Sequence, residues 1–409
     1  MLSMEQLTCI ADKYKTPTYV FDIEELTKRA QSIRKIAGED IGLCFAMKAN
    51  PFLVHYMKPL VDRFEVCSPG EFAICGREKL NMHSVVLSGV FKSKDDVEHA
   101  MQSEVGVYTV ESAGQWETLS GCANQAQKKI SALLRLTSGN QFGLDAADIE
   151  RIVQSRADHP NIEIRGIQFF SGTQKKNMEQ AAKEIEEVGR FCNHLEEKYG
   201  YHAEEVEYGP GLPIAYFAED ADNQDFSKLE QLTDLLKHIR KKHKVTLEIG
   251  RYFTATCGMY LSKIVDIKVN KGCGYCIIDG GIHHVNYYGQ VLALKFPKVN
   301  VVKNENGHYR PDIKEWTICG SLCTTGDILM KKYPMDNPNI GDLIVFYNIG
   351  AYSITETSYL FLSREMPLVL AGLSNEASGV GIEILRQRVK TDRFNSRQQM
   401  GERGKHEIR

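Results

Sequence analysis

The sequence predicts an α/β protein in which an N-terminal (β/α)8 barrel is followed by a C-terminal all-β domain. The first observation is a series of short apolar runs, separated by stretches with apolar residues at helical spacing, that fills the size of such a barrel. The second is a change, from about Met259 onward, to strands joined by turns. The third is the length of 409 residues, too long for one ordinary core. A doubly wound sheet is the alternative fold for the first part.

Each unit of the predicted barrel pairs an apolar run with a helical pattern. Helical spacing among charges is clear at residues 95–102 and 178–198. A short strand at 18–21 precedes the barrel. The predicted barrel strands lie at residues 43–47, 64–67, 85–87, 106–110, 132–136, 164–170, 206–208 and 245–249.

The second domain is expected to contain strands and a hairpin-type turn at Asn304-Glu305-Asn306-Gly307. We therefore expect a barrel at 15–258, a β-domain from 1–24 and 259–396, and a flexible polar tail at 397–409. The predicted strands lie at residues 260–269, 276–279, 299–303, 316–319, 343–347 and 381–385.

Composition excludes several classes of protein. A net charge of -3 with 43% apolar residues fits a globular enzyme, and the chain lacks the excess of positive charge expected of a nucleic-acid-binding protein. No apolar run approaches a membrane span, and no signal pattern opens the chain, so we expect a cytoplasmic protein without a membrane partner. Eleven scattered cysteines indicate free thiols. Cys273-x-x-Cys276 and Cys319-x-x-x-Cys323 lack the loops of a zinc site, so no metal is expected.

Polar and glycine residues follow the predicted barrel strands. The run at 43–47 delivers Lys48 into an Asn-Pro turn signal, so this lysine lies where a strand ends. Catalytic groups of such barrels gather at that end, and a lysine there can form a Schiff base with pyridoxal phosphate. A surface lysine with an apolar stem is the ordinary alternative. Other strand exits carry Ser68-Pro69-Gly70-Glu71, Ser88-Gly89, Arg135, Phe169-Phe170-Ser171-Gly172-Thr173-Gln174, Gly209-Pro210-Gly211 and Glu248-Ile249-Gly250-Arg251.

Two of these exits suit a phosphorylated pyridine cofactor. Gly209 and Gly211 let backbone N–H groups approach a phosphate, and Arg251 on the next loop adds a charged donor. A carboxylate at Glu248 would keep a pyridine nitrogen protonated. Each residue alone also fits a plain turn or an ordinary salt bridge, and their convergence with Lys48 favours the cofactor site.

A set of motifs, in order along residues 15–395, resembles the fold-type III pyridoxal-phosphate decarboxylases, which include diaminopimelate and ornithine decarboxylases. The resemblance implies an alanine racemase-like barrel with a β-domain. The motifs are Phe45-Ala46-Met47-Lys48-Ala49-Asn50-Pro51, residues 65–71, Gly209-Pro210-Gly211, Glu248-Ile249-Gly250-Arg251, Gly320-Ser321-Leu322-Cys323-Thr324-Thr325-Gly326-Asp327 and Gly350-Ala351-Tyr352.

The same resemblance implies the role of each site residue. Lys48 would hold pyridoxal phosphate covalently, and Glu248 would pair with the pyridine nitrogen. Cys323 and Asp327 would reach the active site of the opposite subunit of a homodimer, with Cys323 as proton donor and Asp327 near the substrate. Without the family, Cys323 would be an ordinary buried thiol. The cofactor's ring and phosphate would be contacted by Phe170, Thr173, Gly209, Gly211, Arg251 and Tyr352.

Three departures from the family pattern bear on the substrate. Phe170 stands where the family usually has a histidine that stacks on the ring, and it can stack but cannot carry charge. Thr324 stands where diaminopimelate decarboxylases have a glutamate, and Asp279-Gly280-Gly281-Ile282-His283-His284 lacks the arginine pattern associated with a distal carboxylate. Free diaminopimelate is therefore a poor candidate. His283 and His284 are substrate-end candidates, with satisfied structural histidines as the alternative.

The segments at residues 170–174, 279–284 and 323–324, which include these departures, resemble the branch of the family that contains the butirosin-type L-glutamyl-[acyl-carrier protein] decarboxylase. Siderophore-pathway decarboxylases of citryl-diaminopropionate share the Cys-Thr feature. We therefore expect an α-decarboxylase of an amino-acid-like substrate, either a small molecule or one linked to an acyl-carrier protein. The alternatives are a decarboxylase of diaminopimelate or another basic amino acid, a racemase or epimerase on the same fold, and a non-catalytic binding relative.

Overall fold

The computed structural model describes residues 1–220, 226–304, 313–375 and 379–397, without side chains for 374–375 and 379–380. The described residues divide into two compact units. One unit is Glu25–Ala215 with Ala221–Ala255, and the other is Met1–Glu24, Tyr216–Asp220 and Thr256–Arg409. The expected turn at 304–307 and the expected tail at 397–409 lie almost wholly outside the described residues.

The first unit is a closed barrel of parallel strands, which confirms the predicted fold and excludes the doubly wound sheet. Neighbouring strands pair in sequence order, and the last strand pairs with the first, with Cys44 opposite Glu248. The strands are β2 (Ile41–Ala46), β3 (Arg63–Val66), β4 (Val85–Leu87), β5 (Val107–Val110), β6 (Ile130–Leu136), β7 (Ile162–Phe170), β8 (Glu205–Gly209) and β9 (Lys244–Ile249).

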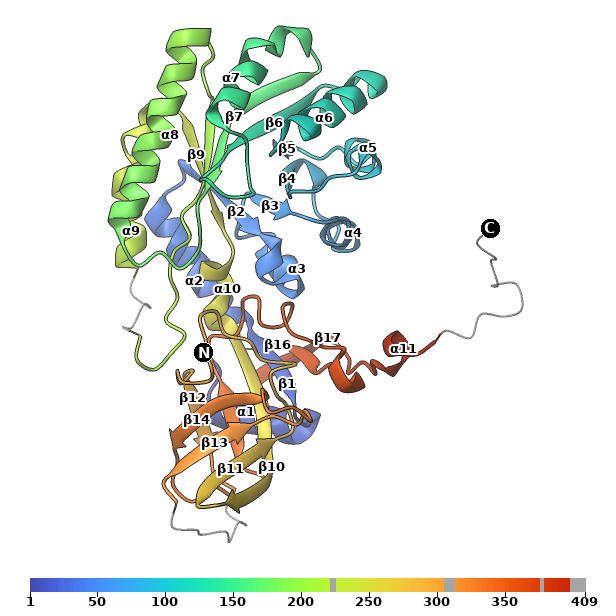
Figure 1. Ribbon diagram of the computed structural model, residues 1–409, viewed down its shortest axis with the longest axis vertical. Coiled ribbons are helices and arrows are strands. Elements are labelled where there is room, and N and C mark those ends of the chain that lie inside the picture. The colour runs from blue at the N-terminus through green and yellow to red at the C-terminus, as the bar shows by residue number, and fades with distance from the viewer. Residues whose placement is uncertain (221–225, 305–312, 376–378, 398–409) are drawn as a thin grey trace, which may run out of the picture. The chain divides into compact units, whose positions relative to one another are not determined.

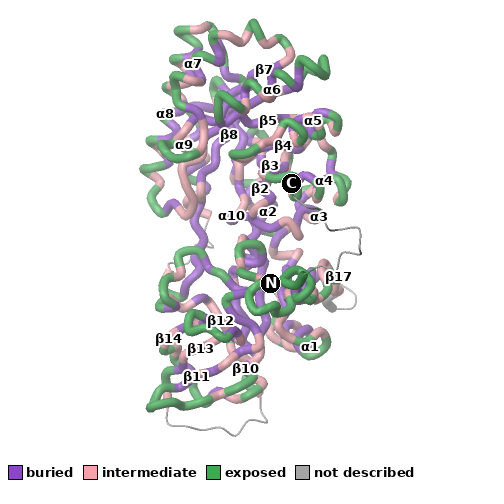
Figure 2. Tube along the Cα trace, turned by 45° about the vertical axis from the view of Figure 1, so that its right-hand side comes forward, coloured by how far each residue is buried: buried purple, intermediate pink, exposed green. Residues whose placement is uncertain are grey.

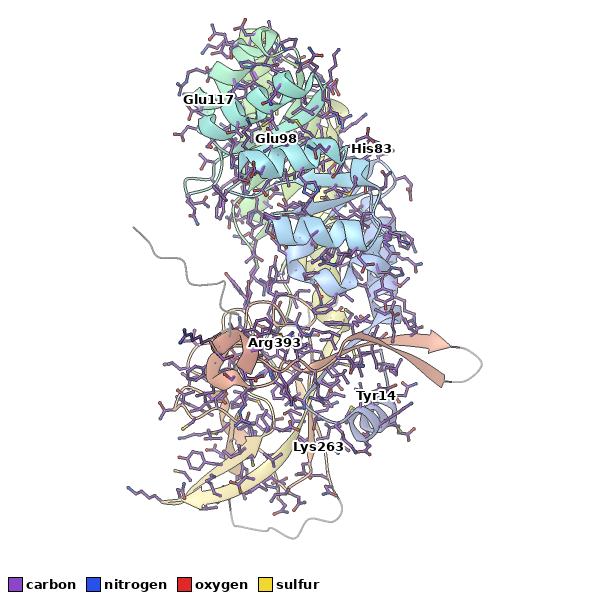
Figure 3. The ribbon with its side chains drawn as sticks, turned by 90° about the vertical axis from the view of Figure 1, so that its right-hand side faces the viewer. Tyr14, His83, Glu98, Glu117, Lys263 and Arg393 are labelled. Atoms are coloured by element: carbon purple, nitrogen blue, oxygen red, sulfur yellow. The ribbon has the colours of Figure 1, made fainter. Side chains whose placement is uncertain are left out.

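Helices follow the strands and lie outside the barrel (Figure 1). Figure 2 shows that the strands are buried and that exposed residues lie on the helices. Glu98 and Glu117, labelled in Figure 3, mark α5 and α6. The helices are α2 (Ile23–Ala37), α3 (Val54–Met57), α4 (Pro69–Arg77), α5 (Lys94–Gln102), α6 (Ala113–Ala126), α7 (Ala146–Gln154), α8 (Met178–Tyr199), α9 (Ser227–Leu236) and α10 (Arg251–Thr254).

The second unit is built on a sheet in the order β14-β13-β11-β10-β1-β16-β17, with β15 pairing β10 and β12. Two of its strands, β14 and β16, were not predicted, nor was helix α1, which Ser3 caps through the backbone of Gln6. The elements are α1 (Met4–Tyr14), β1 (Thr18–Asp22), β10 (Gly258–Asn270), β11 (Cys273–Ile278), β12 (Val299–Val302), β13 (Glu315–Cys319), β14 (Ile328–Pro334), β15 (Leu343–Phe346), β16 (Leu368–Asn375), β17 (Gly379–Arg386) and α11 (Asp392–Asn395).

Helix α1 covers one face of this sheet. Its apolar residues Leu7 and Ile10 pack with Val20 of β1 and Leu261 of β10 in one buried cluster. The amine of Lys263, which is labelled in Figure 3, lies 2.8 Å from the carboxylate of Asp12. Among the described residues, no helix is both long and apolar enough to cross a membrane.

Candidate active site

Lys48 lies at the carboxyl end of a barrel strand. Strand β2 ends at Ala46, and a 3-10 turn, Met47–Ala49, carries the lysine. The side chain of Asn50 accepts a hydrogen bond from the backbone N–H of Phe52 at 3.1 Å, which begins the next turn. The predicted strand therefore ends one residue earlier than expected, and the 38% exposed side chain of Lys48 stands at the rim.

Two buried carboxylates flank the amine of Lys48. Strands β3 and β9 both pair with β2, so Glu65 and Glu248 come from either side of the lysine. Lys48 donates a hydrogen bond to Glu65, and its Nζ lies 3.2 Å from Oε1 of Glu248. The sulfur of Cys67 lies 3.7 Å from the same nitrogen and 3.3 Å from Glu65.

The two carboxylates differ in acidity. Burial raises the pKa of Glu248, and the nearby charge of Glu65 raises it further. Burial alone would also raise the pKa of Glu65, but the amine and hydrogen bond of Lys48 hold it below its usual value. Glu65 is therefore the ionised carboxylate that pairs with the Lys48 amine, and Glu248 is the carboxylate that binds a proton more readily.

A second layer lies behind Glu248. The amide of Gln168 on β7 donates to Glu207 at 2.7 Å and lies 3.4 Å from Oε2 of Glu248. Glu207 is fully buried, and burial together with the charges of Glu248 and Glu205 raises its pKa to about 8. Glu207 is therefore largely neutral at pH 7 and adds little negative charge beneath Glu248.

The segments that follow the carboxyl ends of the neighbouring strands β7, β8 and β9 lie at one rim of the barrel. A Cβ atom at Gly209 would lie 2.5 Å from the ring of Phe170, so only glycine allows this ring its place. Gly211 has φ of +59°, and its carbonyl accepts from the backbone N–H of residue 175 at 2.9 Å. The Nε of Arg251 lies 3.4 Å from the hydroxyl of Thr173. The structure thus brings together the predicted ring and phosphate contacts of the barrel.

The side chains and backbone groups at this rim fit pyridoxal phosphate. Glu65 and Glu248 face one amine, so a protonated pyridine nitrogen would balance the second carboxylate. Phe170 offers an aromatic face, and the glycine loop with Arg251 offers backbone and charged donors of the kind that hold phosphates. The barrel therefore contains groups for the aldehyde, the ring and the phosphate of the cofactor.

The remaining predicted residues belong to the second unit. Cys323 is exposed in the loop between β13 and β14. Asp327 ends this loop, is 2% exposed, and accepts from the backbone N–H groups of Ile282 and Leu322 at 2.8 and 2.7 Å. Its carboxylate therefore fixes the loop that presents Cys323, and its contact with substrate stays a prediction.

The two candidate histidines are buried in the same unit, with ring centroids 3.8 Å apart. His284 contacts the hydroxyl of Tyr260 and the carbonyl of Glu365, both at 2.9 Å, as a structural histidine does. Nδ1 of His283 has no hydrogen-bond partner among the described residues. Burial lowers the pKa of both rings, so they are neutral at pH 7.

Tyr352, the last predicted phosphate contact, has φ of +64°. Its carbonyl accepts backbone hydrogen bonds from Thr355 and Glu356, both at 2.9 Å. The ring is thus carried on a tight turn of the second unit, and its role toward the phosphate stays a prediction.

Four residues around Lys48 were not predicted as site residues: Glu65, Cys67, Gln168 and Glu207. A signal for Glu65 is present, because a carboxylate between Phe64 and Val66 in a buried strand needs a charged partner. Gln168 and Glu207 give a related signal, because a polar side chain within the buried strands β7 and β8 needs a hydrogen-bond partner. Which of these side chains meet could be known only from the register of the closed barrel.

Comparison with known proteins agrees with this geometry. The family described as "Pyridoxal-dependent decarboxylase, pyridoxal binding domain" matches residues 23–255. The chain is 23% identical to L-glutamyl-[BtrI acyl-carrier protein] decarboxylase of Niallia circulans, covering 90% of this chain and 91% of that protein. It is 26% identical to diaminopimelate decarboxylase of Zymomonas mobilis, covering 85% and 86%. It is 24% identical to 2-[(L-alanin-3-ylcarbamoyl)methyl]-2-hydroxybutanedioate decarboxylase of Staphylococcus aureus, covering 89% and 95%.

Solved structures share the fold. Diaminopimelate decarboxylase from Helicobacter pylori, complexed with L-lysine, superposes with a TM-score of 0.82 at 20% sequence identity. The superposition covers 95% of this chain and 98% of that one. The barrel and the β-domain are therefore both present in a protein of known structure.

Proposed function

This chain belongs to the pyridoxal-dependent decarboxylase family, and we propose that it removes the α-carboxylate of an amino-acid-like substrate at the rim formed by Lys48, Glu248 and Arg251. It is a pyridoxal-phosphate-dependent decarboxylase. The observation that carries the site proposal is the placement of the Lys48 amine between two buried carboxylates at the carboxyl end of β2.

Each barrel residue has a distinct task in this proposal. Lys48 would hold the cofactor covalently through its amine and would be displaced by the amine of the substrate, and Glu248 would keep the pyridine nitrogen protonated. Bound pyridoxal phosphate supplies the electron sink for the pair released when carbon dioxide leaves. Phe170 would pack against the ring, while Thr173, Gly209, Gly211 and Arg251 would hold the phosphate and so orient the bound substrate.

The second unit supplies the proton in this proposal. Cys323 of the partner subunit gives a proton to the α-carbon after carbon dioxide has left. The exposure of Cys323 in the single chain supports this role, because an exposed thiol is available to another copy. Asp327 holds the Cys323 loop through backbone hydrogen bonds, and Tyr352 completes the phosphate contacts. The proposal thus includes a homodimer with shared active sites.

The substrate class proposed first is a glutamyl group on an acyl-carrier protein or a related siderophore or antibiotic intermediate. Thr324 and the lack of the arginine pattern at residues 279–284 support it, because both differ from the pattern expected for free diaminopimelate. Similarity to the glutamyl-carrier and the hydroxybutanedioate decarboxylases also supports it. A free basic amino acid is the second candidate, because diaminopimelate decarboxylases are about equally similar.

The test is incubation of the purified protein with pyridoxal phosphate in deuterated water. The panel contains diaminopimelate, ornithine, lysine, arginine, citryl-diaminopropionate and a glutamyl-loaded carrier protein, with product masses measured for each. Loss of carbon dioxide with gain of one deuterium identifies the substrate. Deuterium gain with the carboxylate retained would instead indicate a racemase and refute the proposed reaction.

A further inference from the structure

One buried carboxylate outside the predicted site contacts the loop after β7 and the end of strand β8, next to the proposed cofactor contacts. Glu184 lies on α8 and is paired with Lys175, whose Nζ is 2.6 Å from Oε2. The side chains of Glu184 and Lys175 are 8% and 5% exposed. The same carboxylate accepts from the hydroxyls of Ser171 and Tyr208, the latter at 2.6 Å.

The partners of Glu184 are adjacent in sequence to the proposed cofactor contacts. Ser171 directly follows Phe170, and Tyr208 directly precedes Gly209. Lys175 lies two residues after Thr173, and its backbone N–H donates to the carbonyl of Gly211 at 2.9 Å. One carboxylate therefore fixes the backbone on both sides of Thr173 and the end of β8.

Electrostatics favour a charged pair in this position. Burial alone would raise the pKa of Glu184, but the hydrogen bonds from Lys175, Ser171 and Tyr208 bring it below its usual value. Burial lowers the pKa of Lys175, and its partner Glu184 opposes that change. Replacing one member alone leaves an uncompensated buried charge, so the loop must move or the remaining charge must be hydrated.

The loop is also coupled to the segment after Gly211. The side-chain amide of Gln174 donates to the carbonyl of Ile214 at 3.0 Å and accepts from its N–H at 2.6 Å. A displacement of Lys175 would therefore also displace the loops after β7 and β8, which carry the proposed phosphate contacts.

We propose that Glu184 and Lys175 are positioning residues that hold the loops after β7 and β8 in the geometry that binds the cofactor's phosphate. This inference rests on the proposed phosphate site. The pair touches no reacting atom in this proposal and acts through Thr173, Gly209 and Gly211.

The experiment compares the binding of two probes that differ only in the phosphate. Pyridoxamine 5'-phosphate and pyridoxamine cannot form a Schiff base with Lys48, so their dissociation constants report non-covalent binding to the cofactor-stripped protein. Glu184→Gln should weaken pyridoxamine 5'-phosphate about tenfold or more and leave pyridoxamine within about twofold, because misplaced loops lose the phosphate contacts. Glu187→Gln, an exposed change on the same helix, is the matched control.

The outcomes distinguish the positioning role of Glu184 and Lys175 from the assignment of the phosphate site itself. Thr173→Val removes a proposed direct contact and should show the same phosphate-selective loss; if it has no effect, the phosphate assignment fails. If Thr173→Val weakens binding while Glu184→Gln does not, or if Glu184→Gln weakens both probes equally, the positioning role is refuted. Should Glu184→Gln fail to fold, Tyr208→Phe removes one hydrogen bond from the same carboxylate without leaving an unpaired charge, and it must show the same selectivity.

Discussion

The amine of Lys48 lies 3.2 Å from the carboxylate of Glu248, although 200 residues separate them in the sequence. The contact exists because β2 and β9 close the barrel by pairing with one another. It places the amine of Lys48 beside a carboxylate whose pKa is raised by burial and by the charge of Glu65.

Lys48→Ala should abolish the covalent attachment of pyridoxal phosphate and the absorption band of that linkage, while the fold remains. Borohydride reduction of the wild-type protein, followed by peptide mass spectrometry, should locate the cofactor on Lys48. Lys94→Ala, at an exposed position of α5, should retain the attachment. A cofactor band that persists in Lys48→Ala would remove Lys48 from this role.

Glu248→Gln should lower turnover by about a hundredfold, because a neutral amide cannot stabilise a protonated pyridine nitrogen in the transition state. The attachment to Lys48 should persist, so the defect should appear in turnover and not in loading. Glu117→Gln, on the outer helix α6, is the control (Figure 3). Wild-type turnover in Glu248→Gln would show that the ring nitrogen does not depend on this carboxylate.

Glu207 should make the folded state less stable as pH rises. Its pKa is about 8 in the folded protein against an ordinary value of 4.5, so the folded state binds one more proton between these values. The free energy of unfolding of wild type relative to Glu207→Gln should therefore fall with increasing pH in this window, by up to about 1.4 kcal/mol per unit. Urea unfolding at pH 5, 6.5 and 8 measures it, and a pH-independent difference would contradict the assignment.

Gly209→Ala should displace the ring of Phe170, because the added methyl group would lie 2.5 Å from Cδ2. We expect a loss of about 1–3 kcal/mol in the free energy of unfolding, as for other overpacked sites, together with weaker cofactor binding. Gly114→Ala is the matched control, since a Cβ there has no neighbour within 4 Å. Equal stability of the two variants would mean that the ring moves without cost.

Cys323→Ala should slow protonation of the product and yield deaminated by-products. If the thiol acts in the partner subunit, mixing Lys48→Ala chains with Cys323→Ala chains should restore part of the activity, because a mixed dimer contains one complete site. Cys273→Ala, at another exposed cysteine, should leave the product ratio unchanged. Absence of complementation after verified subunit exchange would place Cys323 in its own chain's site or outside the reaction.

The sequence alone predicted the barrel because strand and helix periodicity is local. It also placed Lys48 and Glu248 at strand exits, and the family motifs supplied the roles proposed for Cys323 and Tyr352. It missed α1, β14 and β16, and it extended β2 into the 3-10 turn that carries Lys48. These elements and boundaries depend on pairing and packing with distant segments, which periodicity does not report.

What the sequence determined by itself is the order of the elements, the residue types at the strand exits and the resemblance to one family of decarboxylases. What only the tertiary structure decided is which of these side chains meet. Closure of β9 onto β2 brings Glu248 to Lys48, and the register of β3, β7 and β8 brings in Glu65, Gln168 and Glu207. The pKa shifts of Glu65, Glu207 and Glu248 arise from burial and from their mutual contacts, so they occur only once the barrel is closed.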